Sequence, residues 1–392
     1  MLMNQWYAIE FASRIKDDEP YRTTVLGEDL VIWKKPSTGE IVVQSDLCVH
    51  RGALLSGGEI FNDCLRCPYH GWEYDETGAC VNIPAHPNTP IPKKARIDTY
   101  PAAQRYGFIW AYLGDTPEAE RPPLPELPID DHPEAKYRDY KVIEAEYHWD
   151  ANYERVLENA IDIAHAPFVH RETFGNPDEP EVEDYTVDND GRSATATVYL
   201  NPPPPSGIWG KIRGKERDKV KTTTGVFFPN VTMLRPELPM GEFLLFTAAV
   251  PIDENRTVSK FIQLRGFFTG NWADKDSVKR TLKIFIEDGP QVIGQRPELL
   301  PFDLQAELHV KSDAIQLAYR RWRQEAYNAG HGIDTHQFLT HKNVKTVIPS
   351  PVRRENPELA NAWVMKEAPR RPGKNGLMDE TSLEGKVEAD VE

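Results

Sequence analysis

Short runs rich in β-branched and aromatic residues, separated by glycine and proline turns, dominate the first 115 residues. Residues 30–34 (LVIWK) and 41–44 (IVVQ) flank a PSTGE turn, which is the pattern of a β-hairpin, and residues 108–113 (FIWAYL) predict another strand. We therefore predict an all-β sandwich or barrel over residues 1–115, whose loops can carry chemistry.

Two segments interrupt this kind of pattern and predict where the domains end. Residues 116–133 are acidic and hold six prolines. Since proline cannot sit inside a helix or a central strand, we predict a surface linker there. Residues 331–392 are predicted to form a C-terminal extension, and its tail after about residue 373 is polar, acidic and expected to be disordered.

Residues 134–330 mix helical and strand periodicities, so the chain as a whole is predicted to be α+β. Apolar positions recur at helical spacing over three stretches, residues 153–163, 276–288 and 304–329. Strand-like runs cover residues 194–200, 225–234, 243–250 and 257–268. Four consecutive prolines at 202–205 predict an exposed loop after the first of these runs.

Length and charge narrow the class of protein. The 392 residues allow two domains with a sizeable core. A net charge of −15, from 61 acidic and 46 basic residues, disfavours nucleic acid and anionic membranes as partners. The sequence shows neither an apolar run of the ~20 residues that a membrane span needs nor a signal peptide, so we expect a cytoplasmic protein.

Two pairs of cysteine and histidine are separated by sixteen residues. Cys48 and His50 form the first pair, and Cys67 and His70 form the second. A Rieske-type [2Fe–2S] centre uses such a set, because two cysteines hold one iron and two histidines hold the other. Imidazole ligands also raise the reduction potential of the cluster. The motif therefore predicts redox chemistry, with these four residues as the cluster ligands.

The residues around the second pair suit a tight cluster loop, since Pro68 fixes one φ and Gly71 can adopt a positive φ. Zinc is the alternative metal, although zinc sites usually space their residues as Cys-x₂₋₄-Cys and His-x₃₋₅-His. A further alternative is that these two cysteines and two histidines are unrelated buried residues that bind no metal. Cys64 and Cys67 also form a Cys-x-x-Cys pair, but outside the βαβ setting of a redox disulfide, so Cys64 and Cys80 are expected to be reduced.

A second pair of histidines follows the first predicted helix. Asn159, Asp162 and His165 recur at every third residue and would share one helical face. Pro167 disfavours the helical conformation of the residue before it, so the helix is expected to end there and His170 to turn back towards His165. Two histidines and one carboxylate form the triad that holds Fe²⁺ and leaves positions open. Partly buried helix-end histidines without a metal are the alternative.

The carboxylate of such a triad must come from elsewhere in the chain, and the helix predicted at 276–288 offers Asp288. Ile284 lies four residues earlier, which places Asp288 on the inward, apolar stripe. Glu287 lies about 100° away around the helix and is expected to be solvated. Without the histidines, such an acidic pair would be ordinary surface charge.

Taken together, the Rieske motif, an Asp-x-x-His-x₄-His motif and a late helical aspartate resemble the catalytic (α) subunit of Rieske non-haem iron oxygenases over about residues 1–330. Residues 287–288 (ED) and 295–297 (QRP) are similar to the family's late motif. The detail is most similar to the single-subunit, phthalate-type branch, and residues 81–87 and 308–313 are similar to saxitoxin-pathway hydroxylases. The O- and N-demethylases are also similar. The resemblance implies a catalytic domain of antiparallel sheet and helices, of the helix-grip or START-like kind, over residues 134–330.

The resemblance also implies cofactors, partners and a reaction. Members carry a [2Fe–2S] cluster and a mononuclear Fe²⁺, use O₂, and receive electrons from a separate NAD(P)H-dependent reductase, in some systems through a ferredoxin. They work as head-to-tail homotrimers in which Asp162 would connect His165 to His70 of the partner subunit, and Asn159 would support the iron site. The expected reaction is hydroxylation or oxidative demethylation of a small aromatic or heterocyclic compound. Aromatic-ring cis-dihydroxylation is the alternative.

The substrate pocket is expected in the second domain, lined by residues such as Phe227, Met233, Phe243 and Leu245. Compared with saxitoxin-type enzymes, this chain has a longer C-terminus and an extended segment at 201–221, both of which could alter the pocket mouth or a subunit contact. Two readings other than an oxygenase are an electron-transfer Rieske ferredoxin, which would need only about the first 115 residues, and a structural zinc protein.

Overall fold

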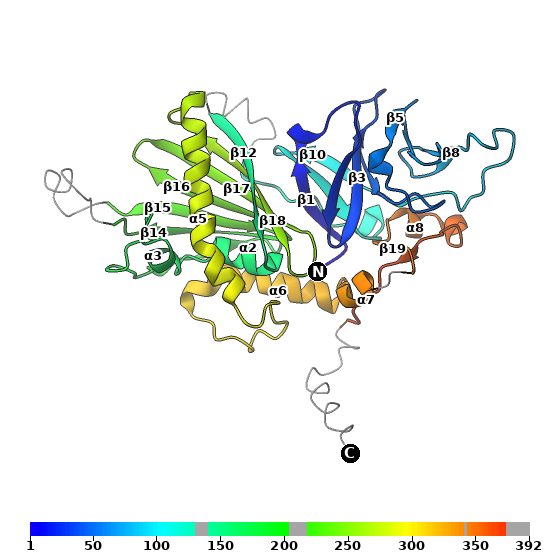
Figure 1. The fold of residues 1–392 in the computed structure, drawn as a ribbon. Coiled ribbons are helices and arrows are strands. Elements are labelled where there is room, and N and C mark those ends of the chain that lie inside the picture. The colour runs from blue at the N-terminus through cyan, green and yellow to red at the C-terminus, as the bar shows by residue number, and fades with distance from the viewer. Residues whose placement is uncertain (130–139, 204–217, 341–342, 374–392) are drawn as a thin grey trace, which may run out of the picture.

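The computed structural model describes residues 1–129, 140–203, 218–340 and 343–373. An all-β half, drawn in blue and cyan, lies beside a half in which helices cover a large sheet (Figure 1). This arrangement confirms the α+β prediction. None of the described helices combines the length and the apolar content needed to cross a membrane.

The N-terminal half consists of three antiparallel sheets. The first has the order β1-β11-β10, formed by Gln5–Phe11, Phe108–Leu113 and Ala102–Arg105. The second has the order β2-β3-β4-β9, formed by Tyr21–Val25, Glu28–Lys34, Ile41–Ser45 and Thr99–Tyr100. The third has the order β5-β6-β7-β8, formed by Glu59–Phe61, Cys64–Arg66, Glu73–Tyr74 and Cys80–Asn82. The predicted hairpin is confirmed as β3 and β4, and the predicted strand at 108–113 as β11.

The other half is built on one seven-stranded antiparallel sheet. Its strands, in the order β12-β18-β17-β16-β15-β14-β13, are Lys141–Trp149, Thr257–Arg265, Gly241–Pro251, Val231–Leu238, Val220–Phe227, Ser193–Leu200 and Val187–Asn189. The single strand predicted over 225–234 is wrong, because a turn around Pro229 separates β15 from β16. Proline cannot donate to a ladder, so it marks the turn between two strands that pair with each other.

Both faces of this sheet are buried, and the residues of β17 alternate between them. Leu245 and Ala249 pack beneath the helices α2 (Tyr153–Ile161), α5 (Asp274–Gly294) and α6 (Ala314–Asn328). Leu244, Phe246 and Ala248 instead share a core with β1 and β11 of the N-terminal half. Because side chains alternate along a strand, one face of the sheet is free to pack against the N-terminal half. The two halves therefore share one continuous core.

The helix boundaries near the histidine pair differ from the prediction. Helix α2 ends at Ile161, because Asp162 adopts extended backbone (φ −71°, ψ 134°) and its Oδ1 accepts a hydrogen bond from the Ala164 N–H at 2.8 Å. Aspartate commonly ends a helix by such local bonding. His165 therefore lies beyond the helix, and the predicted shared helical face is wrong. Pro167 sits in the first turn of the short helix α3 (Ala166–Val169), where its missing N–H costs nothing.

Two later helices also have different bounds. Helix α5 continues past its predicted end to Gly294 with Pro290 inside it. Helix α6 begins at Ala314, ten residues after its predicted start at 304, following a 3₁₀ turn at Lys311–Asp313. The predicted loop at 202–205, the segment at 201–221, the linker at 116–133 and the tail after 373 lie wholly or partly outside the described residues.

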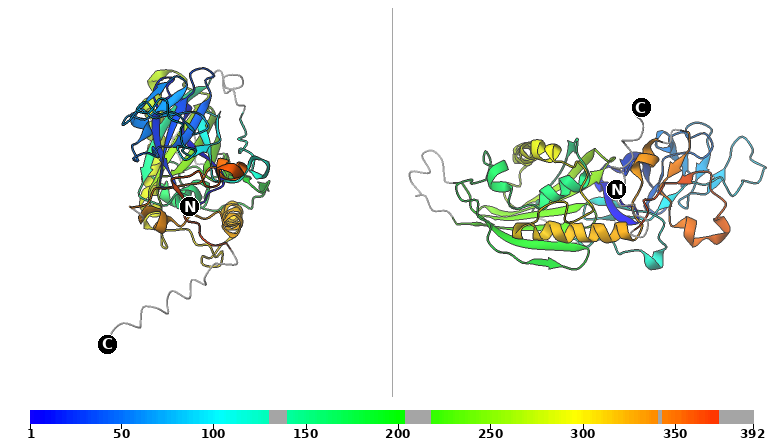
Figure 2. Two further views of the ribbon diagram at one scale, coloured as in Figure 1. Left: turned by 90° about the vertical axis from the view of Figure 1, so that its right-hand side faces the viewer. Right: turned by 90° about the horizontal axis from the view of Figure 1, so that it is seen from below.

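The described part of the C-terminal extension packs against the N-terminal half, where Figures 1 and 2 draw it in orange and red. Its elements are α7 (Thr335–Thr340), β19 (Thr346–Val347), α8 (Val352–Glu355) and β20 (Lys366–Glu367). Buried Arg353 forms a bidentate pair with buried Asp98, with Nη2–Oδ2 at 2.6 Å and Nε–Oδ1 at 2.8 Å. The Ser350 N–H and hydroxyl also donate to Asp98. The extension is thus an integral part of the N-terminal half.

Arg353→Ala tests this attachment. Removing one partner leaves the buried Asp98 charge unpaired, so we expect a loss of about 3–5 kcal/mol of stability and a lower thermal midpoint. Arg280→Ala, at an exposed pair with Asp276 on α5, is the matched control and should change stability by less than about 1 kcal/mol. Equal thermal midpoints for the two variants would contradict a stabilising role of the extension.

Candidate metal centres and pocket

The two Cys/His arms have the same backbone geometry. In each arm the cysteine N–H donates to the carbonyl five residues later, and the glycine four residues later donates back to the cysteine carbonyl. The pairs are Cys48–Ala53 at 2.9 Å, Gly52–Cys48 at 2.8 Å, Cys67–Trp72 at 2.8 Å and Gly71–Cys67 at 3.1 Å. Both glycines have a positive φ, 74° at Gly52 and 71° at Gly71, which side chains rarely adopt. Each arm therefore closes into a tight loop that projects its cysteine and histidine.

The four side chains of these arms are candidates to hold a metal cluster. Cys48 and Cys67 are buried, and the His50 and His70 ring centroids are 4.5 Å apart. The Nδ1 atom of His50 is buried and has no hydrogen-bond partner among the described residues, as expected of a ligand atom without its metal. Burial lowers the pKa of His50, and His70, Arg51 and Lys345 lower it further, which favours the neutral ring that a metal requires.

The remaining cysteines behave as expected from the sequence. Cys64 and Cys80 are free and buried, as are the two cysteines of the arms. Burial raises the pKa of Cys64 to about 11 and that of Cys80 to about 12, so both are unreactive thiols at neutral pH. The structure therefore gives no support to a redox disulfide between Cys64 and Cys67.

A second donor set forms where α5 passes the segment after α2. The Nε2 atoms of His165 and His170 are 3.1 Å apart, and Asp288 Oδ1 lies 3.4 Å and 3.3 Å from them. All three donor atoms lie within 4.8 Å of one another. Asp288 Oδ1 is buried and lacks a hydrogen-bond partner in the described part of the chain. Two imidazole nitrogens and a carboxylate oxygen so placed can hold a divalent ion such as Fe²⁺.

Each histidine of this set has its own carboxylate on the opposite ring nitrogen. Asp162 Oδ2 lies 3.5 Å from His165 Nδ1, and Glu287 Oε2 lies 3.0 Å from His170 Nδ1. Such carboxylates fix the ring orientation and leave Nε2 for the metal. The expectation that Glu287 is solvated is wrong, because its side chain is only 14% exposed and lies against the segment that carries His170. Helical periodicity within α5 could not reveal that Glu287 lies beside His170. The adjacent Glu287-Asp288 pair was the sequence feature that could have indicated a role for both carboxylates.

Protonation of the histidines follows from these contacts. Burial disfavours a charge on His165, but Asp162 and Asp288 outweigh it and raise its pKa to about 9. Burial lowers the pKa of His170. The pKa of Glu287 is lowered, because hydrogen bonds from Thr173 and His170 outweigh its partial burial, so it stays a carboxylate. Metal binding at neutral pH must therefore displace a proton from His165.

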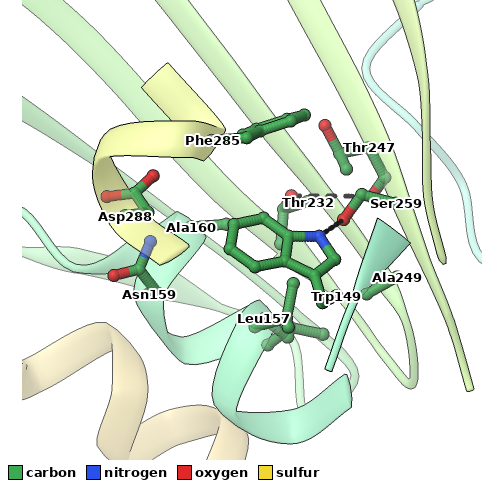
Figure 3. Close-up of a pocket in the computed structure, with 11 residues that line it drawn as sticks. Trp149, Leu157, Asn159, Ala160, Thr232, Thr247, Ala249, Ser259, Phe285 and Asp288 are labelled. Atoms are coloured by element: carbon green, nitrogen blue, oxygen red, sulfur yellow. Dashed lines mark hydrogen bonds between the residues drawn. The ribbon is translucent and has the colours of Figure 1, made fainter. Parts of the chain in front are cut away.

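A small pocket adjoins this donor set, between α2, α5 and the sheet (Figure 3). Asn159 and Asp288 lie at one side, and Trp149, Leu157 and Phe285 form apolar walls. Its cavity of about 30 Å³ holds about one or two water molecules, so a ring-sized substrate requires side-chain movement. The hydroxyl groups of Thr232, Thr247 and Ser259 also line the pocket.

None of the four pocket residues predicted from the sequence lines this cavity. Phe227 and Met233 face the N-terminal half on the other side of the sheet, and Phe243 and Leu245 pack in the core beneath the helices. Because side chains alternate along a strand, Thr232 faces the pocket while Met233 does not. Apolar character alone could not distinguish the two faces, since both are buried.

Fold and donor sets together define a redox protein with two metal centres. Comparison with known families gives the same division of the chain. Residues 5–101 match the Rieske [2Fe-2S] domain, and residues 149–329 match the vanillate O-demethylase oxygenase C-terminal domain.

Characterised relatives match most of the chain. The methylxanthine N1-demethylase NdmA of Pseudomonas putida is 30% identical over 332 residues, covering 79% of this chain and 83% of that protein. The methylxanthine N3-demethylase NdmB of the same species is 31% identical over 335 residues, covering 78% and 82%. The solved structure of Pseudomonas putida CBB5 NdmA with caffeine has a TM-score of 0.68 and 27% identity, covering 83% of this chain and 91% of that chain.

The chain belongs to the Rieske non-haem iron oxygenases, which confirms the resemblance seen in the sequence. It is an oxidoreductase that uses a [2Fe–2S] cluster, mononuclear iron and O₂, with electrons from a separate reductase. The ferredoxin and zinc-protein alternatives are therefore excluded.

Glu287→Gln tests the carboxylate that the sequence did not predict. Losing the charge behind His170 should weaken Fe²⁺ retention by about 10-fold, the lower end of such effects, because the amide can still accept a hydrogen bond. Iron content after competition with a chelator measures this. Asp276→Asn on the exposed side of α5 is the control. Wild-type retention in Glu287→Gln would show that Glu287 does not support the site.

Proposed function

We propose that this protein is a monooxygenase that hydroxylates or oxidatively demethylates a small neutral aromatic or heterocyclic compound. The observation that carries the proposal is the position of Asp288, which belongs both to the second donor set and to the lining of the pocket. A metal held there would lie at the edge of the substrate space. Demethylation begins with hydroxylation of the methyl carbon, so one site serves both reactions.

Under this proposal, His165, His170 and Asp288 hold Fe²⁺, and Cys48, His50, Cys67 and His70 hold the [2Fe–2S] cluster. The convergence of the donor atoms and the unpartnered His50 Nδ1 and Asp288 Oδ1 support these assignments. When bound, the two centres supply O₂ activation and electron transfer. The protein orients the histidines through carboxylates and keeps the reaction in an apolar pocket. Asn159 borders that pocket beside Asp288, where its amide can orient substrate (Figure 3).

The charge of the pocket supports a neutral substrate. Among the described lining residues Asp288 is the charged one, and no lysine, arginine or histidine is present to pair with an acid. Placing an aromatic carboxylate in such a pocket would leave it desolvated, with no basic side chain in the lining to pair with it. The relatives named as methylxanthine N1- and N3-demethylases support N-demethylation of a heterocycle.

The assembly proposed is a head-to-tail homotrimer. The strands β5 to β8 and helix α3 lie at opposite ends of the folded molecule (Figure 1), which supports electron transfer between subunits rather than within one. His70 is exposed, as is Tyr69 beside it. Asp162 is 29% exposed and would bridge His165 to His70 of the partner subunit. This arrangement gives the Asp162 carboxylate a second histidine to orient.

Two further proposals concern organisation and location. We propose domain limits of 1–115 and 134–330, with the linker at 116–133 between them and an extension at 331–392, whose described part belongs with the first domain. Packing of residues 343–373 against Asp98 supports this assignment. A cytoplasmic location is supported by the four unpaired cysteines and the need for an NAD(P)H-dependent donor.

Asp162→Ala separates electron transfer from metal binding. In protein prepared with excess Fe²⁺ we expect both metals to be present but turnover to fall by at least 10-fold, because the bridge between His165 and His70 of the partner subunit is removed. Metal analysis and steady-state turnover measure the two properties. Asp150→Ala, at an exposed position just before α2, controls for the loss of a carboxylate. A wild-type rate in Asp162→Ala would exclude the bridging role.

The function itself is tested by turnover of iron-loaded protein under ¹⁸O₂ with a surrogate reductase. The panel pairs neutral N-methyl heterocycles and methoxy-arenes with their carboxylated analogues. We expect a single labelled oxygen, or formaldehyde with a demethylated product, and at least a 10-fold higher kcat/KM for the neutral member of each pair. Two labelled oxygens would establish a dioxygenase, and faster turnover of the acids would overturn the neutral-substrate proposal.

A further inference from the structure

A lysine of the C-terminal extension lies on the first cluster arm. The Lys345 ammonium donates a hydrogen bond at 3.2 Å to the carbonyl of Val49, the residue between Cys48 and His50. That contact joins positions 296 residues apart in the sequence. Lys345, a residue of the C-terminal extension, thus places a full positive charge beside the loop that carries Cys48 and His50.

The lysine stem also fits the shape of this arm. A Cβ added at Gly52 would lie 3.3 Å from Lys345 Cε and 3.6 Å from its Nζ. The side chain therefore crosses the arm at the glycine that closes it, where φ is 74°. Glycine serves two purposes at this position, since it permits the turn and leaves room for the lysine.

The backbone around Lys345 is fixed rather than free. Its carbonyl accepts a hydrogen bond at 2.8 Å from the Lys366 N–H, and the next residues pair with β20. Val347, two residues later, is fully buried in the core that contains Cys48 and Cys67. In the described part of the chain, Lys345 Nζ has no carboxylate partner that would neutralise its charge.

We propose that Lys345 raises the reduction potential of the cluster. A cluster held by these arms would accept one electron from the reductase and would gain one negative charge by doing so. A fixed positive charge next to the arm stabilises the reduced form more than the oxidised form. This inference rests on the proposed cluster ligands, and it gives the C-terminal extension a role in electron transfer.

The test is a potentiometric titration of the cluster in the intact protein, followed by its visible absorption and electron paramagnetic resonance. In Lys345→Met, the ratio of reduced to oxidised cluster at a fixed applied potential should fall about 3- to 10-fold, where tenfold corresponds to about 59 mV for one electron. Lys345→Gln should behave in the same way. Lys345→Arg keeps the charge and should restore a ratio within about twofold of wild type.

Lys366→Met is the matched control, because it removes the same charge from an exposed lysine on the adjacent strand. It should leave the ratio unchanged. An unchanged potential in both neutral Lys345 variants, or an equal shift in Lys366→Met, would overturn the inference. Iron and sulfide content separates this result from failure of the proposed function, since protein without a cluster would contradict the ligand assignment itself.

Discussion

Burial of the seven-stranded sheet on both faces is the constraint on which the rest of the structure depends. One face packs beneath α2, α5 and α6, and the other packs against β1 and β11. A sheet used in this way cannot shift register without exposing apolar residues on one side and burying polar ones on the other. Helix α5 with Asp288, and the half that carries the cluster arms, are therefore fixed to the same set of strands.

The interface between β1 and the seven-stranded sheet also contains polar contacts, which make it specific. The Asn230 side chain bonds to the backbone of Ala8 in both directions, at 3.2 Å and 3.0 Å. Buried Lys260 pairs with buried Glu10 at 2.9 Å and with Glu146 at 3.2 Å. Buried charges require such partners, so these contacts favour one alignment of β1 on the sheet. The separation of the two metal centres within one chain follows from that alignment.

The iron site shows how distant segments share one electrostatic task. Helix α2 ends where the Ala164 N–H donates to the Asp162 carboxylate, and α5 brings Asp288 and Glu287 from more than a hundred residues away. Asp288 faces the pocket because it continues the buried stripe of Thr281, Phe285 and Val292. Each histidine then has a carboxylate on its Nδ1 and directs its Nε2 to the donor set that it shares with Asp288. The C-terminal extension repeats this principle at the cluster, where Lys345 reaches an arm formed near the other end of the chain.

The sequence by itself determined the chemistry, because cluster and triad ligands must have particular residue types at particular spacings. The Cys-x-His and Cys-x-x-His arms, the histidine pair and the α+β division are all readable from local pattern. Asp288 could also be predicted from the sequence, since it lies on the apolar stripe of a single helix. These features depend on residues close together in the chain, or on the spacing of apolar residues within one helix or strand.

Tertiary structure alone decided what depends on neighbours from other elements. Glu287 was assigned to solvent because its partner His170 lies on another segment. Met233 was assigned to the pocket because periodicity cannot say which of two buried faces meets the substrate. The sequence could not show that residues 343–373 pack on the first domain, since the Asp98–Arg353 pair and the Lys345 contact join positions more than 250 residues apart. Long-range pairing of this kind leaves no local pattern, and only the folded chain reveals it.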